Sequence, residues 1–435
     1  MNIKTKIKQR IPKKVLNLRH LFFAWLGSVR YGNPSEEMLV IGITGTSGKS
    51  TTVSLLRQLL ERAGYTVGSL STIDFYIAGQ NKLNDKKMTM LGKMQIQKYL
   101  REMADKGCNI AIVETTSEGR VQHRHRFINY DMMLLTNLYP EHIDSHGSFE
   151  NYRQAKIDLF DYVALSKRKV LQGKQIEKVA IINTSIQDYA LFQNEMFDRI
   201  VPFGKDASLD VESCVTRQDG IHFSVHEREF FAPMYGEHNA MNIVAVMAVA
   251  RILDIPWSGI QEAVATFHNV PGRLEFIAES EAYGFKTIVD YAFEPEAMKK
   301  LYDVVALLKP KRIIHVFGST GGGRDKERRF VLGEYIGTRA DLCIITDEDP
   351  YDDDPLSIIR DVAQAVEATG KQEHVSYLIE PDRKKAIGRA IQQATPGDIV
   401  LITGKGSEQA MVIKQVLVPW DDRTIAREAI ASRVN

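Results

Sequence analysis

A glycine-rich turn between an apolar run and an amphipathic segment constrains this sequence most. The apolar residues 38–43 are followed by Thr44-Gly-Thr-Ser-Gly-Lys-Ser-Thr51. Helical spacing begins at once, with apolar side chains at Val53, Leu55, Leu56, Leu59 and Leu60. A buried strand, a glycine loop and a helix in this order are the setting of a phosphate-binding loop. The pattern therefore predicts an α/β domain that binds a nucleotide.

The residue types in this loop predict how it would hold a polyphosphate. Gly45 and Gly48 let backbone N–H groups approach the phosphates, and the helix N-terminus adds partial positive charge. Lys49 would reach the outer phosphates, and Ser50 would offer its hydroxyl to Mg²⁺. The strict Walker spacing is not met, because the sixth position before Lys49 is Ile43 rather than glycine. An ordinary strand-to-helix turn is the alternative, and the flanking strand and helix favour the phosphate loop.

Length and charge bound the class of protein. A chain of 435 residues predicts two or three domains. The net charge of +1 argues against a nucleic acid as the main partner. Cys108, Cys214 and Cys343 lie far apart without metal-ligand spacing, which fits a reducing compartment and not a disulfide framework. We therefore expect a cytoplasmic protein that binds no nucleic acid.

The N-terminal segment departs from this average, because eight basic residues precede the first acid, Glu36. They surround Leu21-Phe-Phe-Ala-Trp-Leu26, a run too short to span a bilayer and without a convincing cleavage site after it. Such a segment could lie on an anionic membrane surface, a peripheral contact through residues 1–35. The interpretation that we favour is a basic helix whose Phe/Trp face packs on the next domain. The eight residues are Lys4, Lys6, Lys8, Arg10, Lys13, Lys14, Arg19 and Arg30.

Strand and helix patterns alternate along the rest of the chain. After the phosphate loop we expect strands over 65–73, 109–113, 130–135 and 179–182, helices over 95–106, 152–165 and 239–252, a polar loop over 79–87 and short β segments over 200–232. Around residues 270–275 the alternation starts afresh, with strands over 287–290, 312–317, 342–346 and 399–403. This predicts an α/β fold in three parts: a basic segment (1–37), a central P-loop ATP-binding domain with a mostly parallel sheet (38–272) and a Rossmann-like C-terminal domain (273–435).

Polar side chains follow several of the expected strands, where open α/β sheets bind their ligands. Glu114 comes after a buried strand, as a Mg²⁺-binding acid does, and the alternative is a solvent-facing acid. His142, Asp144 and His146 follow another strand, in a spacing that matches no zinc signature. Lys156 lies on the next helix, where a lysine is by default solvated.

Two glycine loops in the C-terminal half also follow strands, Gly318-Ser-Thr-Gly-Gly-Gly-Arg-Asp325 and Gly404-Lys-Gly-Ser-Glu408. Their glycines permit close backbone approach, and Arg324 could clamp a carboxylate or phosphate with two hydrogen bonds. Two such loops in one domain favour a binding function.

The motifs of this sequence, and their order along the chain, resemble those of the Mur ligase family over about residues 38–410. Within that family they resemble the branch that adds the third residue of the peptidoglycan stem peptide. The stretches that carry the resemblance are Thr44-Gly-Thr-Ser-Gly-Lys-Ser-Thr51, Glu114-Thr-Thr-Ser117, Thr136-Asn-Leu138 with Glu141-His-Ile-Asp144, Tyr152 with Ala155-Lys156, then Gly236, Asn239 and Asn242, Val270-Pro-Gly-Arg273, Val289-Asp-Tyr-Ala292, Arg324-Asp-Lys326 and Gly404-Lys-Gly406.

The resemblance implies a ligase mechanism, in which ATP converts a substrate carboxylate to an acyl phosphate and an incoming amine displaces the phosphate to leave an amide. It implies catalytic roles for Lys49, Glu114, His142 and Lys156, the last carbamylated by CO₂. It further implies two Mg²⁺ ions, served by Ser50, Glu114, His142 and the modified Lys156. The residues matching nucleotide contacts are Gly45, Thr46, Ser47, Gly48, Lys49, Ser50, Thr51, Asn242, Arg273 and Asp290.

Departures from the family pattern concern the substrate parts. The 37 residues before the first strand are fewer than the family's uridine-diphosphate-binding domain needs, so we expect that domain to be largely missing. The family's Asp-Asn-Pro-Arg motif reads Glu348-Asp-Pro-Tyr351, and a tyrosine cannot supply a guanidinium fork. Gly-Lys-Gly-His-Glu reads Gly404-Lys-Gly-Ser-Glu408. The candidate substrate residues are Arg324, Asp349, Tyr351, Lys405 and Glu408.

The acid-rich run Asp347-Glu-Asp-Pro-Tyr-Asp-Asp-Asp354 suggests an incoming amino acid with an extra positive charge, such as lysine or ornithine. A solvated acidic loop is the alternative.

We therefore predict an ATP-dependent amide ligase that joins a small-molecule or peptide-precursor carboxylate to an amino acid in peptidoglycan-type precursor synthesis. One alternative is a Mur-like ligase with a substrate that carries no uridine diphosphate, as in folate-polyglutamate, cyanophycin-like or other cell-wall peptide synthesis. Another is a non-catalytic nucleotide-binding module docked at a membrane, and a third is a phosphotransferase that needs no amine.

Overall fold

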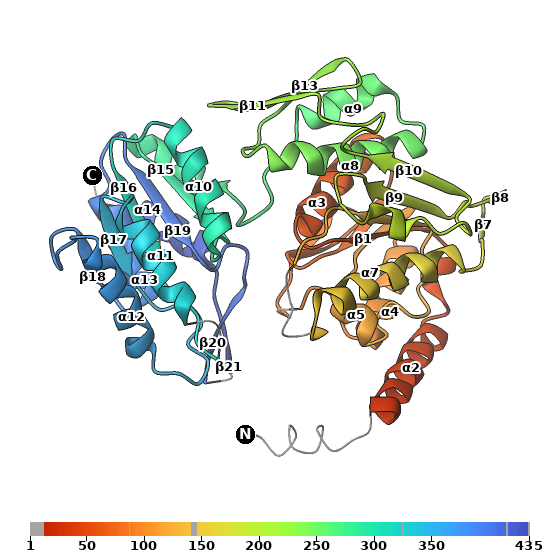
Figure 1. Cartoon of the computed structure of the whole chain (residues 1–435), viewed down its shortest axis with the longest axis horizontal. Coiled ribbons are helices and arrows are strands. Elements are labelled where there is room, and N and C mark those ends of the chain that lie inside the picture. Colours follow the sequence, from red (N-terminus) through yellow and green to blue (C-terminus); the bar gives the residue numbers. More distant parts are fainter. Residues whose placement is uncertain (1–12, 87, 141–145, 324–325, 415, 434–435) are drawn as a thin grey trace. The chain divides into compact units, whose positions relative to one another are not determined.

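The computed structural model describes residues 13–86, 88–140, 146–323, 326–414 and 416–433 (Figure 1). The chain separates into two compact units. The first unit comprises the described residues up to 216 and 220–268, and the second comprises 217–219 and the described residues from 269 onward. The change of unit therefore falls at 268/269, four residues before the domain boundary predicted from the sequence at 272/273.

The first unit is built on an eight-stranded sheet with the order β10-β9-β6-β1-β5-β2-β3-β4. The strands from β10 to β2 run parallel, and only β3 and β4 are antiparallel to their neighbours. This confirms the predicted mostly parallel sheet. The strands are β1 (Leu39–Thr44), β2 (Val67–Leu70), β3 (Asp74–Ile77), β4 (Gln80–Leu83), β5 (Ile110–Glu114), β6 (Met132–Leu135), β9 (Val179–Asn183) and β10 (Arg199–Phe203).

The loop expected over residues 79–87 is wrong at 80–83, which form β4 and pair with β3. Strand β4 is a polar and exposed edge strand. It therefore lacks the apolar alternation by which a strand is predicted.

Helices cover both faces of this sheet, as Figure 1 shows. Helices α3 (Lys49–Arg62), α8 (His238–Ile252) and α9 (Trp257–Val264) share one hydrophobic cluster with Ile41 and Ile43 of β1. Helices α4 (Lys93–Asp105) and α7 (Phe149–Ala164) share the other with Val40. Because β1 is buried on both faces, it appears in the sequence as an unbroken apolar run.

Shorter elements complete the first unit. A three-stranded sheet contains β11 (Ser213–Arg217), β12 (Gly220–Val225) and β13 (Arg228–Ala232), which agrees with the β segments expected over 200–232. The remaining elements are α5 (Ser117–Val121), η2 (Tyr189–Phe192) and the two-stranded β7 (Val170–Leu171) and β8 (Lys174–Gln175).

The basic segment forms helix α2 (Lys13–Arg30) and a short 3₁₀ helix, η1 (Pro34–Glu36). Helix α2 packs on α4 through small residues, since Ala24, Gly27 and Ser28 are buried while Phe22 and Trp25 are about half exposed. The interpretation that we favoured, in which the Phe/Trp face packs on the next domain, is therefore wrong. Small side chains let two helix backbones approach closely, and a Cβ at Gly27 would lie 3.2 Å from the carbonyl oxygen of Lys93.

Among the described residues, no helix has the length and apolar character needed to cross a bilayer.

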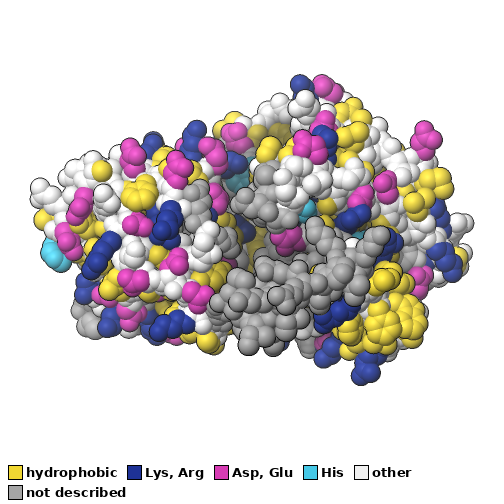
Figure 2. All heavy atoms as spheres, turned by 60° about the horizontal axis from the view of Figure 1, so that its bottom comes forward, with side chains coloured by type: hydrophobic (Ala, Val, Ile, Leu, Met, Phe, Trp, Pro, Cys, Tyr) yellow, Lys and Arg dark blue, Asp and Glu magenta, His cyan; other side chains and the backbone are white. Residues whose placement is uncertain are grey.

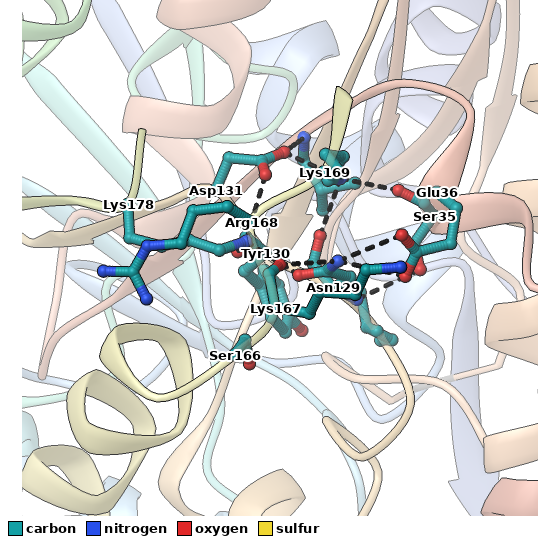
Figure 3. A network of polar contacts seen from close by, with 12 residues as sticks. Ser35, Glu36, Asn129, Tyr130, Asp131, Ser166, Lys167, Arg168, Lys169 and Lys178 are labelled. Carbon is teal, nitrogen blue, oxygen red and sulfur yellow. Dashed lines mark hydrogen bonds and ion pairs between the residues drawn. The ribbon is translucent and has the colours of Figure 1, made fainter. Parts of the chain in front are cut away.

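A buried polar network ties the segment before β1 to the sheet (Figure 3). The Asp131 carboxylate accepts hydrogen bonds from the Val40 N–H (2.8 Å) and the Lys178 ammonium (3.1 Å), and forms an ion pair with Lys169 (2.8 Å). The Lys169 ammonium also donates to the carbonyl oxygens of Ser35 and Asn129. Burial lowers the pKa of both lysines, and the charge of Asp131 opposes that shift. The network fixes the polypeptide where it enters the sheet.

The second unit has a six-stranded sheet with the order β14-β15-β19-β16-β17-β18, in which only β14 is antiparallel to its neighbour. Helices α10, α11 and α12 contribute to the hydrophobic cluster on one face, and α13 and α14 to the cluster on the other. This confirms the predicted Rossmann-like C-terminal fold.

The elements of the second unit are β14 (Glu275–Phe276), η3 (Ala278–Tyr283), β15 (Lys286–Asp290), α10 (Pro295–Leu307), β16 (Ile313–Phe317), α11 (Glu327–Gly337), β17 (Leu342–Ile345), α12 (Pro355–Ala368), β18 (Tyr377–Ile379), α13 (Arg383–Gln393), β19 (Ile399–Thr403), the hairpin β20 (Ala410–Ile413) and β21 (Val416–Pro419), and α14 (Asp422–Ala431).

Candidate nucleotide and ligase site

The predicted phosphate loop joins the end of β1 to the start of α3. Gly48 is the N-cap of α3 and has a left-handed backbone with φ 76°. A Cβ at Gly48 would lie 2.5 Å from the Asn242 side-chain oxygen, so α8 brings Asn242 against the loop. The Lys49 ammonium folds back onto the loop and donates to the carbonyl oxygens of Gly45 (3.0 Å) and Thr46 (2.8 Å). The loop thus presents a helix N-terminus and a lysine together, as phosphate binding requires.

Residues that follow β6 hold this loop in shape. The Asn137 side-chain oxygen accepts hydrogen bonds from the backbone N–H groups of Thr46 (3.1 Å) and Ser47 (2.9 Å). The Thr136 hydroxyl donates to the Ser47 carbonyl oxygen (2.8 Å). A Cβ at Gly45 would come within 1.9 Å of that hydroxyl oxygen, which explains the glycine. These contacts preorganise the loop.

Ser50 and Glu114 meet beside the loop. The Ser50 hydroxyl donates to the buried Glu114 carboxylate over 3.0 Å. Thr72 orients the same carboxylate, with its N–H at 2.7 Å and its hydroxyl at 3.0 Å. A carboxylate and a hydroxyl are hard oxygen ligands, which suits Mg²⁺. Among the described residues, no three His, Cys, Asp or Glu side chains cluster closely enough to hold a metal by themselves.

Lys156 reaches the loop from α7, contrary to the default of a solvated lysine. Its side chain is fully buried, and its ammonium donates to the Gly45 carbonyl oxygen over 2.8 Å. The ammonium also lies over the ring of Tyr152, 4.5 Å from the ring centre, while the Tyr152 hydroxyl donates to the Thr46 hydroxyl oxygen over 3.1 Å. Tyr152 and Lys156 are one helical turn apart, so α7 directs both at the loop. His142 and Asp144 lie outside the described residues.

The structure therefore brings five predicted residues to one loop of the first unit: Lys49, Ser50, Glu114, Lys156 and Asn242. Two residues without a predicted role also contribute: Asn137 holds the loop in place, and Thr72 orients the carboxylate of Glu114. A threonine or asparagine at a strand end is a weak signal, because these residues also favour ordinary turns.

In the second unit, Asp290 and Arg273 lie at the end of β15. The Asp290 carboxylate accepts hydrogen bonds from the N–H groups of Leu274 (2.6 Å) and Ala292 (2.7 Å). Burial raises the pKa of Asp290, and the charge of Arg273 opposes that shift. The Arg273 guanidinium lies over the Tyr291 ring, 4.3 Å from its centre. Arg273 is thus held by stacking at the end of the strand.

Lys405 is the centre of a buried charge cluster in the loop after β19. Its ammonium donates to both carboxylate oxygens of Asp349 (2.9 Å each), to Glu408 (2.6 Å) and to the carbonyl oxygen of Ala410 (2.8 Å). Burial lowers the pKa of Lys405, but Glu408 and Asp349 outweigh it, so the pKa lies above its usual value. The Val412 N–H donates to Asp349 as well (2.7 Å). Three predicted substrate residues are therefore bound to one another.

The acid-rich run is engaged inside the second unit at several positions. Burial raises the pKa of Glu348 to about 7, with Arg383 and Lys405 opposing the shift. Asp353 accepts a hydrogen bond from the Gly322 N–H (3.1 Å), and Asp354 caps α12. Together with the Asp349–Lys405 pair, these contacts favour a structural role for much of the run.

Tyr351, another predicted substrate residue, lies against the glycine loop that follows β16. Tyr351 has a left-handed backbone (φ 54°), and its N–H donates to the Val412 carbonyl oxygen (3.1 Å). Its ring packs where a Cβ on Gly322 would lie. Arg324 is outside the described residues.

Gly272 and Gly406 explain why two motifs of this unit contain glycine. A Cβ at Gly272 would lie 2.1 Å from the Ser407 nitrogen, and one at Gly406 would lie 2.5 Å from the Gly272 carbonyl oxygen. Both residues have positive φ values, 64° and 50°. The two loops approach each other backbone to backbone, so these glycines serve packing between loops.

Comparisons with known proteins extend over most of the chain. The family model for the Mur ligase middle domain matches residues 43–250, and that for the Mur ligase glutamate ligase domain matches residues 272–406. A UDP-N-acetylmuramyl-tripeptide synthetase of Roseiflexus sp. (strain RS-1) is 34% identical over 434 residues, covering 97% of this chain and 84% of the relative. The chain belongs to the Mur ligase family.

Other members of the Mur ligase family agree with this assignment. A UDP-N-acetylmuramoyl-L-alanyl-D-glutamate–2,6-diaminopimelate ligase of Aquifex aeolicus (strain VF5) is 32% identical over 409 residues, which is 92% of this chain and 79% of the relative. A solved structure of a ligase of the same name superposes with a TM-score of 0.60 at 26% identity, covering 91% of this chain and 79% of the other. Mur ligases are ATP- and Mg²⁺-dependent acid–amino-acid ligases of peptidoglycan precursor synthesis. The predicted resemblance and the reading as an amide ligase are confirmed.

Proposed function

We propose that this Mur ligase activates the carboxylate of a peptidoglycan-type precursor and joins it to an amino acid, with residues 38–272 binding ATP and residues 273–435 forming the ligase domain. One observation carries the proposal: the ammonium groups of Lys49 and Lys156 and the Ser50–Glu114 pair all lie at the same glycine loop. A turn that only connected a strand to a helix would not need a buried lysine from α7.

The reaction has two balanced steps. A carboxylate oxygen of the acceptor attacks the terminal phosphorus of ATP, ADP leaves, and an acyl phosphate forms. The amine nitrogen of the amino acid then attacks the acyl carbon, inorganic phosphate leaves, and the nitrogen gives up a proton as the amide forms. Lys49 and the N–H groups at the start of α3 would bind the phosphates and offset the charge that develops on their oxygens. Asn242, Arg273 and Asp290 would contact the nucleotide, as the resemblance implies.

Two Mg²⁺ ions would be held by oxygen ligands from Ser50, Glu114 and a carbamate on Lys156, together with His142. Bound there, they would neutralise charge on the transferring phosphoryl group. The Lys156 ammonium first loses a proton, and the neutral amine then adds to CO₂ and releases a second proton, so that the two steps together change a cation into an anion. Burial of Lys156 supports this, because an unmodified ammonium adjacent to Lys49 adds a second positive charge where a Mg²⁺ ion would have to bind.

The contacts within the second unit bear on the amino acid that is added. The Asp349 carboxylate already pairs with the Lys405 ammonium and accepts a hydrogen bond from the Val412 N–H. It is therefore poorly suited to attract a second positive charge on the substrate. We therefore favour the alternative in which the acidic run is structural. Arg324, Tyr351, Lys405 and Glu408 remain our candidates for contact with the acceptor or the amino acid.

The test is phosphate release from ATP by the purified full chain, screened with amino acids against carboxylate acceptors that do and do not carry uridine diphosphate. We expect release that requires both an acceptor and an amino acid. Lys49→Ala should lower it by at least about a hundredfold, whereas the exposed Lys205→Ala should not change it. Phosphate transferred to a stable product without any amine would indicate a phosphotransferase. Nucleotide binding without turnover under every combination would indicate a non-catalytic module.

Chemical rescue tests the carbamate. Lys156→Ala should lose phosphate release and regain part of it when a short carboxylic acid is added, because the acid can occupy the position of the carbamate. The same acid should not rescue Lys49→Ala, since that variant lacks a cation. Failure to rescue Lys156→Ala at any acid concentration would contradict the carbamate while leaving the ligase reaction standing.

A further inference from the structure

Helix α2 carries an exposed apolar stripe along one side. Its members recur at helical spacing and cover an arc of about 100° on the helix surface. Their exposed fractions range from 37% to 67%. The stripe consists of Leu18, Leu21, Phe22, Trp25 and Val29. Two of these side chains are aromatic. Large apolar side chains gathered on one exposed face indicate a surface that contacts another molecule or a membrane.

The opposite side of α2 is attached to the first unit. Ala24, Gly27 and Ser28 are buried against it, and the Lys93 ammonium lies 2.8 Å from a ring nitrogen of His20, linking α4 to α2. After the helix, the Asp131 network holds residues 35–38. The stripe therefore points outward from a helix that is fixed on the unit, and among the described residues no element covers it.

The charge around this stripe has one sign. Residues 1–35 contain eight lysine and arginine residues and no aspartate or glutamate. Arg19 and Arg30 are exposed on α2 itself. Figure 2 shows the hydrophobic patch at the lower right of the molecule with Lys and Arg side chains beside it. An apolar face bordered by basic residues is the pattern of helices that lie in the plane of an anionic membrane surface.

We propose that the exposed face of α2 docks this protein on the surface of an anionic phospholipid bilayer. The 18 residues of α2 would lie along the interface over about 27 Å, with the stripe in the acyl boundary and the basic residues at the headgroups. Each basic residue near such a surface strengthens binding about fivefold. A second copy of the chain is a poorer occupant, because residues 1–35 carry eight basic residues and no acid, so two copies that paired through this segment would repel each other.

The proposal is independent of the ligase reaction, because the residues of α2 are not part of the nucleotide loop. It also differs from the alternative of a non-catalytic membrane module, since docking and catalysis can coexist. If docking fails, the proposed function stands; if phosphate release fails, the docking result still stands.

Sedimentation with lipid vesicles tests the proposal on the full chain. Vesicles of phosphatidylcholine alone are compared with vesicles that contain phosphatidylglycerol, at low and high salt. We expect binding to the anionic vesicles that weakens as salt rises, and at least about tenfold weaker binding to the neutral ones. Phe22→Ser with Trp25→Ser should weaken binding at least about tenfold by removing apolar area.

Matched variants separate the surface from general effects. Leu165→Ser and Val375→Ser remove two exposed apolar side chains elsewhere and should leave binding unchanged. Arg19→Glu with Arg30→Glu keeps the stripe but reverses two charges, and should weaken binding to anionic vesicles by at least about tenfold. Thermal unfolding should be the same for every variant, since all six side chains are exposed.

Three results would overturn the proposal. The first is no binding of the wild-type chain to phosphatidylglycerol vesicles. The second is binding that the Phe22→Ser/Trp25→Ser variant retains in full. The third is a stable dimer that this variant abolishes while vesicles remain unbound, which would assign the face to a second copy.

Discussion

Replacing Glu348 by glutamine should change how the stability of the second unit depends on pH. Glu348 follows β17, and its side chain is buried among Lys405, Arg383 and two further carboxylates. Burial disfavours the ionised form of a carboxyl group. A glutamine has nearly the same shape but cannot ionise, so the variant isolates the effect of that charge.

The magnitude follows from the two pKa values. Burial raises the pKa of Glu348 from 4.5 to about 7 in the folded state, against the opposing charges of Arg383 and Lys405. Between these pH values the folded protein holds a proton that the unfolded chain has released, so the free energy of unfolding falls as pH rises. The values differ by about 2.5, which at about 1.4 kcal/mol for each pH unit amounts to about 3.5 kcal/mol. This loss is complete above about pH 8 and absent below about pH 4.5.

Urea unfolding at several pH values between 5 and 8.5 measures the effect. Trp420 lies in the second unit, so a background with Trp25→Phe and Trp257→Phe makes fluorescence report that unit alone. Glu348→Gln should gain about 2.5 kcal/mol relative to the background between pH 5 and 8.5, because the unfolded chain is already mostly ionised at pH 5. Glu334→Gln, at an exposed position of α11, should follow the background at every pH. Parallel curves for Glu348→Gln and the background would refute the reasoning.

Two further variants test stability elsewhere. Asp131→Asn should destabilise the first unit by about 3–5 kcal/mol in urea unfolding, because it removes the carboxylate with which two buried ammonium groups form ion pairs. Its control, Glu428→Gln, breaks an exposed ion pair and should cost less than about 1 kcal/mol; equal effects of the two would contradict the buried network. Gly272→Ala should lower the Tm of the second unit, since its Cβ would meet the Ser407 nitrogen at 2.1 Å. Gly388→Ala, inside α13 with open space around it, should instead stabilise by up to about 1 kcal/mol, and an unchanged Tm for Gly272→Ala would show that the loops can separate.

The phosphate loop was predictable because its parts are contiguous. The buried strand, the glycines, Lys49 and the amphipathic helix occupy one stretch of sequence, and local periodicity identifies them. Lys156, which also reaches the loop, was predicted only through the resemblance, because a lysine on a helix is by default solvated. Its hydrogen-bond acceptor, the Gly45 carbonyl oxygen, lies 111 residues earlier in the chain. The role of Thr72 toward Glu114 was missed for the same reason.

The N-terminal helix illustrates the opposite outcome. Its basic and aromatic composition left two interpretations open, and we favoured the wrong one. Which side of α2 packs depends on the surface that α4 presents, and that surface accepts small residues at Ala24 and Gly27. Composition ranks large apolar side chains as the buried ones, so it cannot anticipate a close contact between helix backbones.

By itself, the sequence determined the α/β class, the alternation of strands and helices that gives a mostly parallel sheet, and the family. Hydrophobic periodicity and the residues of each motif are local properties of a chain. Tertiary structure alone decided which charges are available to a ligand. The acidic run at 347–354 reads as a free negative patch, but Asp349 is neutralised by Lys405 from a strand end 56 residues away. Pairing of buried charges depends on distances through space, and strand order rather than chain order sets those distances.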